Sequence, residues 1–275
     1  MGQNTWLKNG VFIAAFLGAS AVFSRFCGQV AQNYRLFLLF DQTLLNLLIP
    51  LLLSIALIAV AVSLVALFVK PFWLIIVSSV ISAMIIFLSQ PEAFFGAICV
   101  AYALLTIAFA GGVSSSLNNQ LSFSTKPVGQ HQKTFFWGLI LLIAAGFVIG
   151  YQKNQQETGF IIPAEYREKT IAAALNLISG QLEGQNLPAS QKKLVASELS
   201  KRTEEALLTV EKAIEPYSRY IPYLLGALLA STFSFVLGLM GIFIPWAVGS
   251  IVLLLRTTGF LRTITETREV KKLAL

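Results

Sequence analysis

Six long stretches without a charged side chain constrain this chain more than any other feature. They cover residues 10–24, 44–69, 72–89, 93–113, 135–151 and 220–255. A helix that crosses the hydrocarbon core of a bilayer, about 30 Å thick, needs about 20 mostly apolar residues. Only 12% of the 275 residues are charged, roughly half the fraction of a soluble domain. We therefore predict an integral membrane protein, folded as an all-α polytopic transmembrane helix bundle.

The last uncharged stretch is too long for one simple crossing. Its 36 residues would form a straight helix of about 54 Å. Gly238, Gly241 and Pro245 lie in its middle, where a tight turn needs such residues. We predict two short helices, 220–239 and 244–258, which form a transmembrane hairpin and bring the total to about seven spans. A single crossing, with six spans in all, is the alternative.

Residues 152–219 differ from the rest, because they contain nine basic and nine acidic side chains. Two amphipathic stripes run through this segment with helical spacing. They consist of Ile171, Ala174, Leu175, Ile178 and Leu182, and of Val195, Leu199, Thr203, Ala206, Val210 and Ile214. Pro216 and Pro222 follow, where proline ends or bends a helix. The segment is predicted to be a soluble αα-hairpin.

The predicted organisation therefore has four parts. A five-span region (1–151) precedes the soluble hairpin (152–219), the transmembrane hairpin (220–258) and a basic C-terminal tail (259–275). With seven spans, Trp6, Trp73, Trp137 and Trp246 lie at one membrane face, whereas Tyr34, Tyr151, Tyr217, Tyr220 and Tyr223 lie at the other. Outside the long polar segment, seven basic residues on the Tyr side against four on the Trp side make the Tyr side cytoplasmic.

This orientation puts the soluble hairpin and the tail in the cytoplasm, beneath a bacterial-type cytoplasmic membrane. The six-span alternative moves the tail to the other face, where nine basic residues then gather, and leaves the hairpin outside. The net charge of +7 is explained by these loop residues. Because no basic patch is interleaved with aromatic residues, nucleic acid is not an expected partner.

The residues that carry chemistry are few. His131 is the one histidine and Asp41 the one aspartate, and three predicted spans between them exclude a Ser/His/Asp triad. Cys27 and Cys99 are placed near the same face, within reach of each other, and are interpreted as packing residues because a zinc site needs three or four ligands. We predict no catalytic residue, metal or cofactor. A membrane enzyme would have to use Glu92, His131 or glutamates of the polar segment.

The predicted spans contain no Asp, Glu, Lys, Arg or His. Proton-coupled transporters and voltage sensors place such groups at bilayer depth, so both classes are disfavoured. The hydroxyl side chains in the spans are expected to bond to preceding carbonyls or to a neighbouring helix. They are Ser78, Ser82, Tyr102, Thr106, Ser231 and Ser234. Residues 111–119, rich in Gly, Ser and Asn, are interpreted as a flexible polar connection.

Small residues at four-residue spacing indicate faces where helices approach closely. Gly226, Ala230, Ser234 and Gly238 form one such row; Gly138, Gly146 and Gly150 form a second, and Ala14 with Gly18 a third. With these faces and without catalytic groups, the sequence favours a non-catalytic assembly, docking or scaffold component. Its partner is a protein or a second copy, bound through residues 165–215. The alternative is a carrier or channel for a neutral or amphipathic solute.

Overall fold

The computed structural model describes residues 3–32, 42–89, 93–120, 123–158, 164–183 and 189–261. These residues fold into helices joined by short connections, and they contain no strand. The helices in chain order are α1 (Gln3–Gln32), α2 (Gln42–Phe68), α3 (Phe72–Ser89), α4 (Ala93–Asn118), α5 (Lys126–Thr158), α6 (Ala164–Glu183), α7 (Ala189–Ile214), the 3-10 helix η2 (Glu215–Tyr220) and α8 (Ile221–Thr257).

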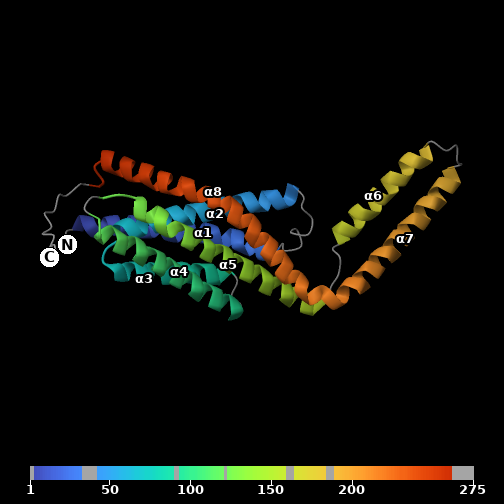
Figure 1. Cartoon of the computed structure of the whole chain (residues 1–275), viewed down its shortest axis with the longest axis horizontal. Coiled ribbons are helices and arrows are strands. Elements are labelled where there is room, and N and C mark those ends of the chain that lie inside the picture. Colours follow the sequence, from blue (N-terminus) through green and yellow to red (C-terminus); the bar gives the residue numbers. More distant parts are fainter. Residues whose placement is uncertain are drawn as a thin grey trace, which may run out of the picture.

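The helices form an elongated bundle with a projecting pair at one end (Figure 1). Helix α1 packs against α2 and α3, α4 lies against α3 and α5, and α8 runs along α5. The start of α1 and the end of α8 share one end of the bundle, hereafter the termini end. Helices α6 and α7 extend from the opposite end, hereafter the hairpin end, and pack on each other.

Local signals explain where several helices begin and end. The Ser124 hydroxyl accepts a hydrogen bond from the backbone N–H of Lys126 at 3.2 Å, which caps the start of α5. Gly259 adopts a left-handed backbone with φ of 75° just past α8, a conformation that glycine tolerates best. Pro216 in η2 and Pro222 in the first turn of α8 separate α7 from α8, as predicted.

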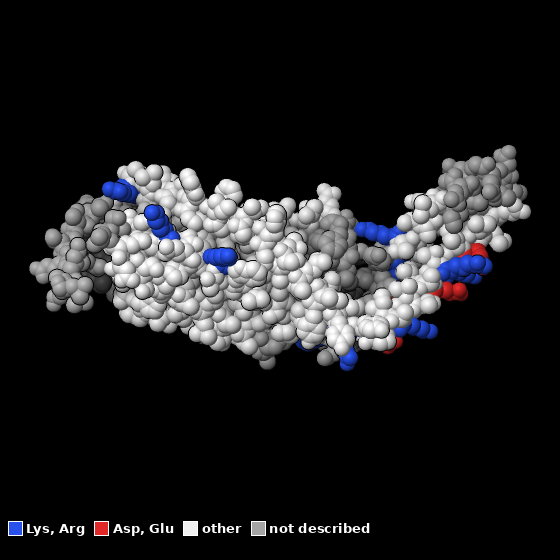
Figure 2. Space-filling model, in the orientation of Figure 1, with Lys and Arg blue, Asp and Glu red and all other residues white. Residues whose placement is uncertain are grey.

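The bundle is apolar inside and outside. Phe16, Leu51, Ile55 and Phe135 are buried in its core, while large apolar side chains such as Leu104 and Phe235 are exposed on its surface. In the view of Figure 2 the acidic side chains lie on the projecting helices, and much of the bundle surface is uncharged. Six described helical segments are long and apolar enough to cross a membrane. The predicted all-helical bundle with membrane-capable helices is confirmed.

The predicted turn within residues 220–255 is wrong, because α8 is one continuous helix of 37 residues. Pro245 lies inside it, where a missing N–H removes one backbone hydrogen bond. Packing along α5 opposes a fold-back at this point. The ring of Phe136 lies 3.9 Å from the Cβ position of Gly241, and Pro245 lies 3.5 Å from the Cβ position of Gly129. A turn would give up these contacts.

Residues 111–118 also differ from the prediction of a flexible connection, because they continue α4 as helix. Gly112 lies against the ring of His131 on α5, and the Cβ position of Gly111 lies 3.6 Å from the ring of Phe72 on α3. Neighbouring helices therefore cover this glycine-rich end of α4, and that packing outweighs the low helix propensity of its Gly and Asn residues.

Helices α6 and α7 pack on each other, but the predicted stripe of α7 is not the buried face, because its Val195, Ala206 and Val210 are exposed. Among the described side chains of the pair, Leu207 alone is buried. An ion pair joins the two helices, with Arg167 Nη2 lying 2.5 Å from Glu211 Oε1. On α7 itself, Glu198 Oε1 and Arg202 Nε form an i,i+4 ion pair at 3.7 Å. The sequence around Asn186 and Pro188 predicts a break between the two apolar stripes, and these residues lie outside the described part of the chain.

Candidate functional site

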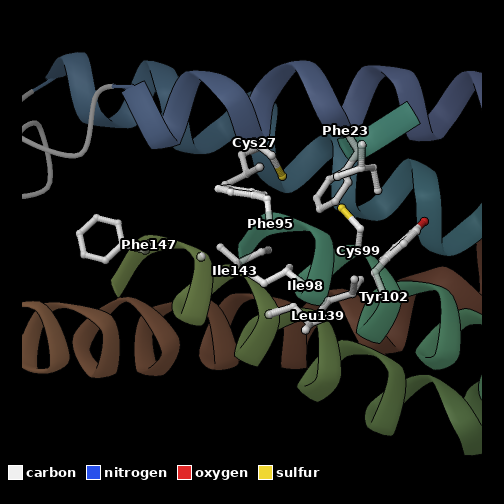
Figure 3. Close-up of a pocket in the computed structure, with 13 residues that line it drawn as sticks. Phe23, Cys27, Phe95, Ile98, Cys99, Tyr102, Leu139, Ile143 and Phe147 are labelled. Atoms are coloured by element: carbon white, nitrogen blue, oxygen red, sulfur yellow. The ribbon is translucent and has the colours of Figure 1, made fainter. Parts of the chain in front are cut away.

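An apolar cavity lies between α1, α4 and α5. It measures about 70 Å³. Its wall includes Phe23 and Cys27 from α1, Cys99 and Tyr102 from α4, and Gly146 from α5. Figure 3 shows both thiols directed into the space between α1 and α4. The two cysteines line one cavity, as their predicted placement near one membrane face implied, although neither forms a disulfide.

A buried chain of hydroxyl groups lies beside this cavity. Tyr102 contributes its ring to the wall, and its hydroxyl points away from the cavity (Figure 3). That hydroxyl lies 3.0 Å from Ser82 Oγ, which lies 2.6 Å from Ser20 Oγ. Ser20 donates to the carbonyl of Phe16 at 2.8 Å. The chain joins α1, α3 and α4 and satisfies three buried hydroxyls, so the cavity retains an apolar lining.

The other hydroxyls that the sequence singled out bond within their own helices. Ser78, Thr106, Ser231 and Ser234 each donate to a carbonyl three or four residues earlier. This is the arrangement predicted for them. A donor committed to its own backbone offers little to a passing solute, so these groups do not define a polar path through the bundle.

The predicted small-residue rows divide into close contacts and open positions. A Cβ at Gly226 would lie 2.5 Å from Val148 Cγ2, and one at Gly138 would lie 2.5 Å from Leu105 Cδ1. Gly226 therefore brings α8 close to α5, and Gly138 brings α5 close to α4. Around Gly18, Gly150 and Gly238 no atom comes within 4 Å of such a Cβ. Ala14 is exposed, whereas Ala230 and Ser234 are half-buried.

Gly146 lies between these two extremes of close helix contact and open space. A Cβ there would make ordinary contacts with Ile98 at 3.5 Å and Phe95 at 3.9 Å, and both of these side chains line the cavity. The glycine therefore leaves part of the cavity open, and no helix backbone presses against it. The spacing of small residues predicted that a neighbouring helix packs against Gly146. In the structure, Gly146 borders the apolar cavity instead.

A second polar contact, which the sequence analysis did not identify, lies at the termini end. Ser116 Oγ lies 3.0 Å from His131 Nε2, and Gly112 leaves room for the imidazole. The next residue, Gln132, is 1% exposed, and its side-chain amide has no hydrogen-bond partner among the described residues. Asp41 and Glu92, the other groups considered for catalysis, lie outside the described residues.

A wider groove opens on the outer surface between α2 and α8. It measures about 450 Å³ and is lined entirely by apolar residues, among them Ala56, Val60, Met240 and Ala247. Exposed Leu57 and Phe243 flank it. In the described part of the chain, no cluster of three or more His, Cys, Asp or Glu side chains has the geometry to hold a metal ion.

Together these features define an all-helical protein with membrane-capable helices and an apolar internal cavity. Comparison with models of known protein families, with curated proteins and with solved structures found no match. The function therefore has to be argued from the geometry of this chain.

Proposed function

We propose that the chain crosses a bacterial-type cytoplasmic membrane six times, with α8 as the last span. The continuity of α8 supports this count. Tyr223 and Trp246 are exposed on α8, and their separation of 23 positions in the sequence corresponds to about 35 Å of helix. That length matches a hydrocarbon core of about 30 Å crossed by a tilted helix, with aromatic side chains at both interfaces.

Six spans reverse the orientation predicted for the α6–α7 pair. In the six-span topology, nine basic residues outside residues 152–219 fall on one face of the membrane: Lys8, Lys70, Lys126, Lys133, Arg256, Arg262, Arg268, Lys271 and Lys272. Arg25 and Arg35 fall on the other face. Because basic residues in short loops favour the cytoplasm, the proposal places both termini inside. The α6–α7 pair then lies outside the cell, whereas the seven-span prediction placed it in the cytoplasm.

We infer that this protein is a non-catalytic docking or assembly component and that α7 presents the partner surface. One observation carries this proposal. Leu194 and Leu208 are exposed, lie four helical turns apart on the same face, and point away from the face that contains buried Leu207. Leu194 is 70% exposed, a high value for a large apolar residue. A partner protein or a second copy would bury these leucines on binding.

The docking proposal is tested on the full-length chain in membranes. Reversible crosslinking before mild detergent extraction should produce one discrete adduct whose mass identifies a second copy or a different protein. Leu194→Glu and Leu208→Glu should each abolish it, whereas Ala206→Glu, which adds the same charge at an exposed position about 120° or more around α7 from both leucines, should preserve it. An adduct retained in both leucine variants would refute the proposed surface.

The alternative function, a carrier for a neutral or amphipathic solute, is favoured by the cavity between α1, α4 and α5. A carrier needs a site that solute reaches from both faces, whereas this cavity is lined by residues toward the hairpin end of the bundle, such as Cys27 and Phe147. Uptake of radiolabelled solutes into liposomes that contain the purified chain would establish this alternative. Absence of uptake together with the crosslinked adduct would favour docking.

A further inference from the structure

We propose that the cavity between α1, α4 and α5 binds the end of one phospholipid acyl chain from the surrounding bilayer. This inference goes beyond the docking function and does not depend on it. The lining is apolar apart from two thiols and the ring edge of Tyr102, whose hydroxyl is bonded to Ser82 at 3.0 Å. The cavity therefore offers no unpaired donor for a headgroup or a polar solute.

The size of the cavity favours a slim occupant. At about 70 Å³, it has half the volume of the engineered apolar cavity, about 150 Å³, that admits benzene. A ring is therefore too large, and the end of an unbranched alkyl chain fits. A methylene group that enters the cavity exchanges water or loosely packed lipid for close-packed side chains. It therefore gains favourable van der Waals contacts.

Acyl chains of the surrounding bilayer can reach the cavity. The cavity is not fully closed, and Cys27, Phe95 and Ile143 in its wall are half-buried. Beside them on α4 and α5, Val100 and Leu141 are exposed on the outer surface. In the proposed topology these side chains face hydrocarbon, so lipid chains are the molecules at the rim of the cavity. Gly146 provides the room, because a larger side chain there would extend into it.

The test uses the full-length chain in nanodiscs of phosphatidylcholine. A small fraction of this lipid carries a diazirine near the methyl end of one acyl chain. The measured quantity is the ratio of photoadducts on inward-facing Cys99 and Ile143 to adducts on their outward neighbours Val100 and Leu141. Cys99 and Val100 are adjacent in sequence and Leu141 and Ile143 are two residues apart, so membrane depth differs by about 3 Å at most and exposure differs within each pair.

In the unmodified chain, adducts on the inward-facing residues are expected. Gly146→Leu should fill the cavity and lower the ratio about tenfold, which corresponds to about 1.4 kcal/mol. The matched control is Gly150→Leu, one turn along α5, where no atom lies within 4 Å of an added Cβ; it should keep the original ratio. Adducts confined to Val100 and Leu141 in the unmodified chain would overturn the proposal, as would an unchanged ratio in Gly146→Leu.

A second measurement keeps the proposal testable if Gly146→Leu fails to fold. Cys99 is buried and lines the cavity, so a bound chain should shield its thiol from N-ethylmaleimide. Alkylation of Cys99 in the unmodified protein should be several-fold faster after delipidation in a short-chain detergent and slow again once phosphatidylcholine is restored. Equal rates in both states, with the helix content unchanged, would show that no chain occupies the cavity.

Discussion

At the scale of single residues, Gly226 and Gly238 show that one residue type serves different purposes within one helix. Both lie on α8 in the same four-residue row. Gly226 is buried and lies so close to Val148 that a Cβ would not fit between them. Gly238, in contrast, faces open space. A row at four-residue spacing rotates about 40° per step around the helix, so it leaves the contact with α5 after two or three steps.

Substitution of these two glycines should give opposite results. Gly226→Leu should lower the free energy of unfolding by about 1 to 3 kcal/mol, because Val148 is stiff in a helix and cannot clear the added side chain. Gly238→Leu should leave stability unchanged or raise it by up to about 1 kcal/mol through better helix propensity. Thermal unfolding in detergent micelles measures both. Equal stability of the two variants would contradict the close approach at Gly226.

At the scale of helices, the α6–α7 pair depends on an ion pair because its apolar contact is small. Leu207 is its one buried side chain among those described, which makes the helix pair marginal without other contacts. Arg167 and Glu211 are 23% and 11% exposed, so their contact is better shielded from solvent than the Glu198–Arg202 pair at 60% and 76%. Shielded charge pairs contribute more than exposed ones.

Charge reversal should distinguish these two ion pairs. Arg167→Glu should raise the amide hydrogen-exchange rates of α6 about tenfold, because it replaces a partly buried attraction with repulsion beside Glu211. Arg202→Glu, at an exposed pair, should change them little. The combination Arg167→Glu with Glu211→Arg should restore protection. Exchange in α6 that is insensitive to all three changes would mean that the ion pair does not hold the helices together.

At the scale of the whole molecule, the continuity of α8 places the α6–α7 pair and the end of α8 at opposite ends of the bundle. We expect Ser197→Cys, in a background without Cys27 and Cys99, to react with a membrane-impermeant maleimide in intact cells. Thr258→Cys should react only after permeabilisation. Both positions are exposed, so access depends on sidedness. Labelling of both from the same side would restore the two-span arrangement of residues 220–255.

Much of this architecture could be predicted because it depends on local properties. Uncharged stretches such as 44–69 predict helices, since a backbone in hydrocarbon has to satisfy its hydrogen bonds internally. The helical spacing of apolar residues in 152–219 predicted helices there, but it did not predict that Leu207, outside the stripe, is the buried residue of α7 among those described. The turn at Gly238, Gly241 and Pro245 was wrongly predicted, because these residues permit a turn without requiring one. The contacts of α8 with Gly129 and Phe136 decided that the helix continues.

The sequence by itself determined the helical class, the membrane-capable segments and the polar character of residues 152–219, because each of these follows from side chains within one turn or one span. Tertiary structure alone decided which glycines are close contacts, that Cys27 and Cys99 share a cavity beside Gly146, and that Ser116 meets His131. These outcomes depend on residues far apart in the chain. Side-chain spacing within one helix specifies a face, but the rotation and height of the neighbouring helix decide what that face meets.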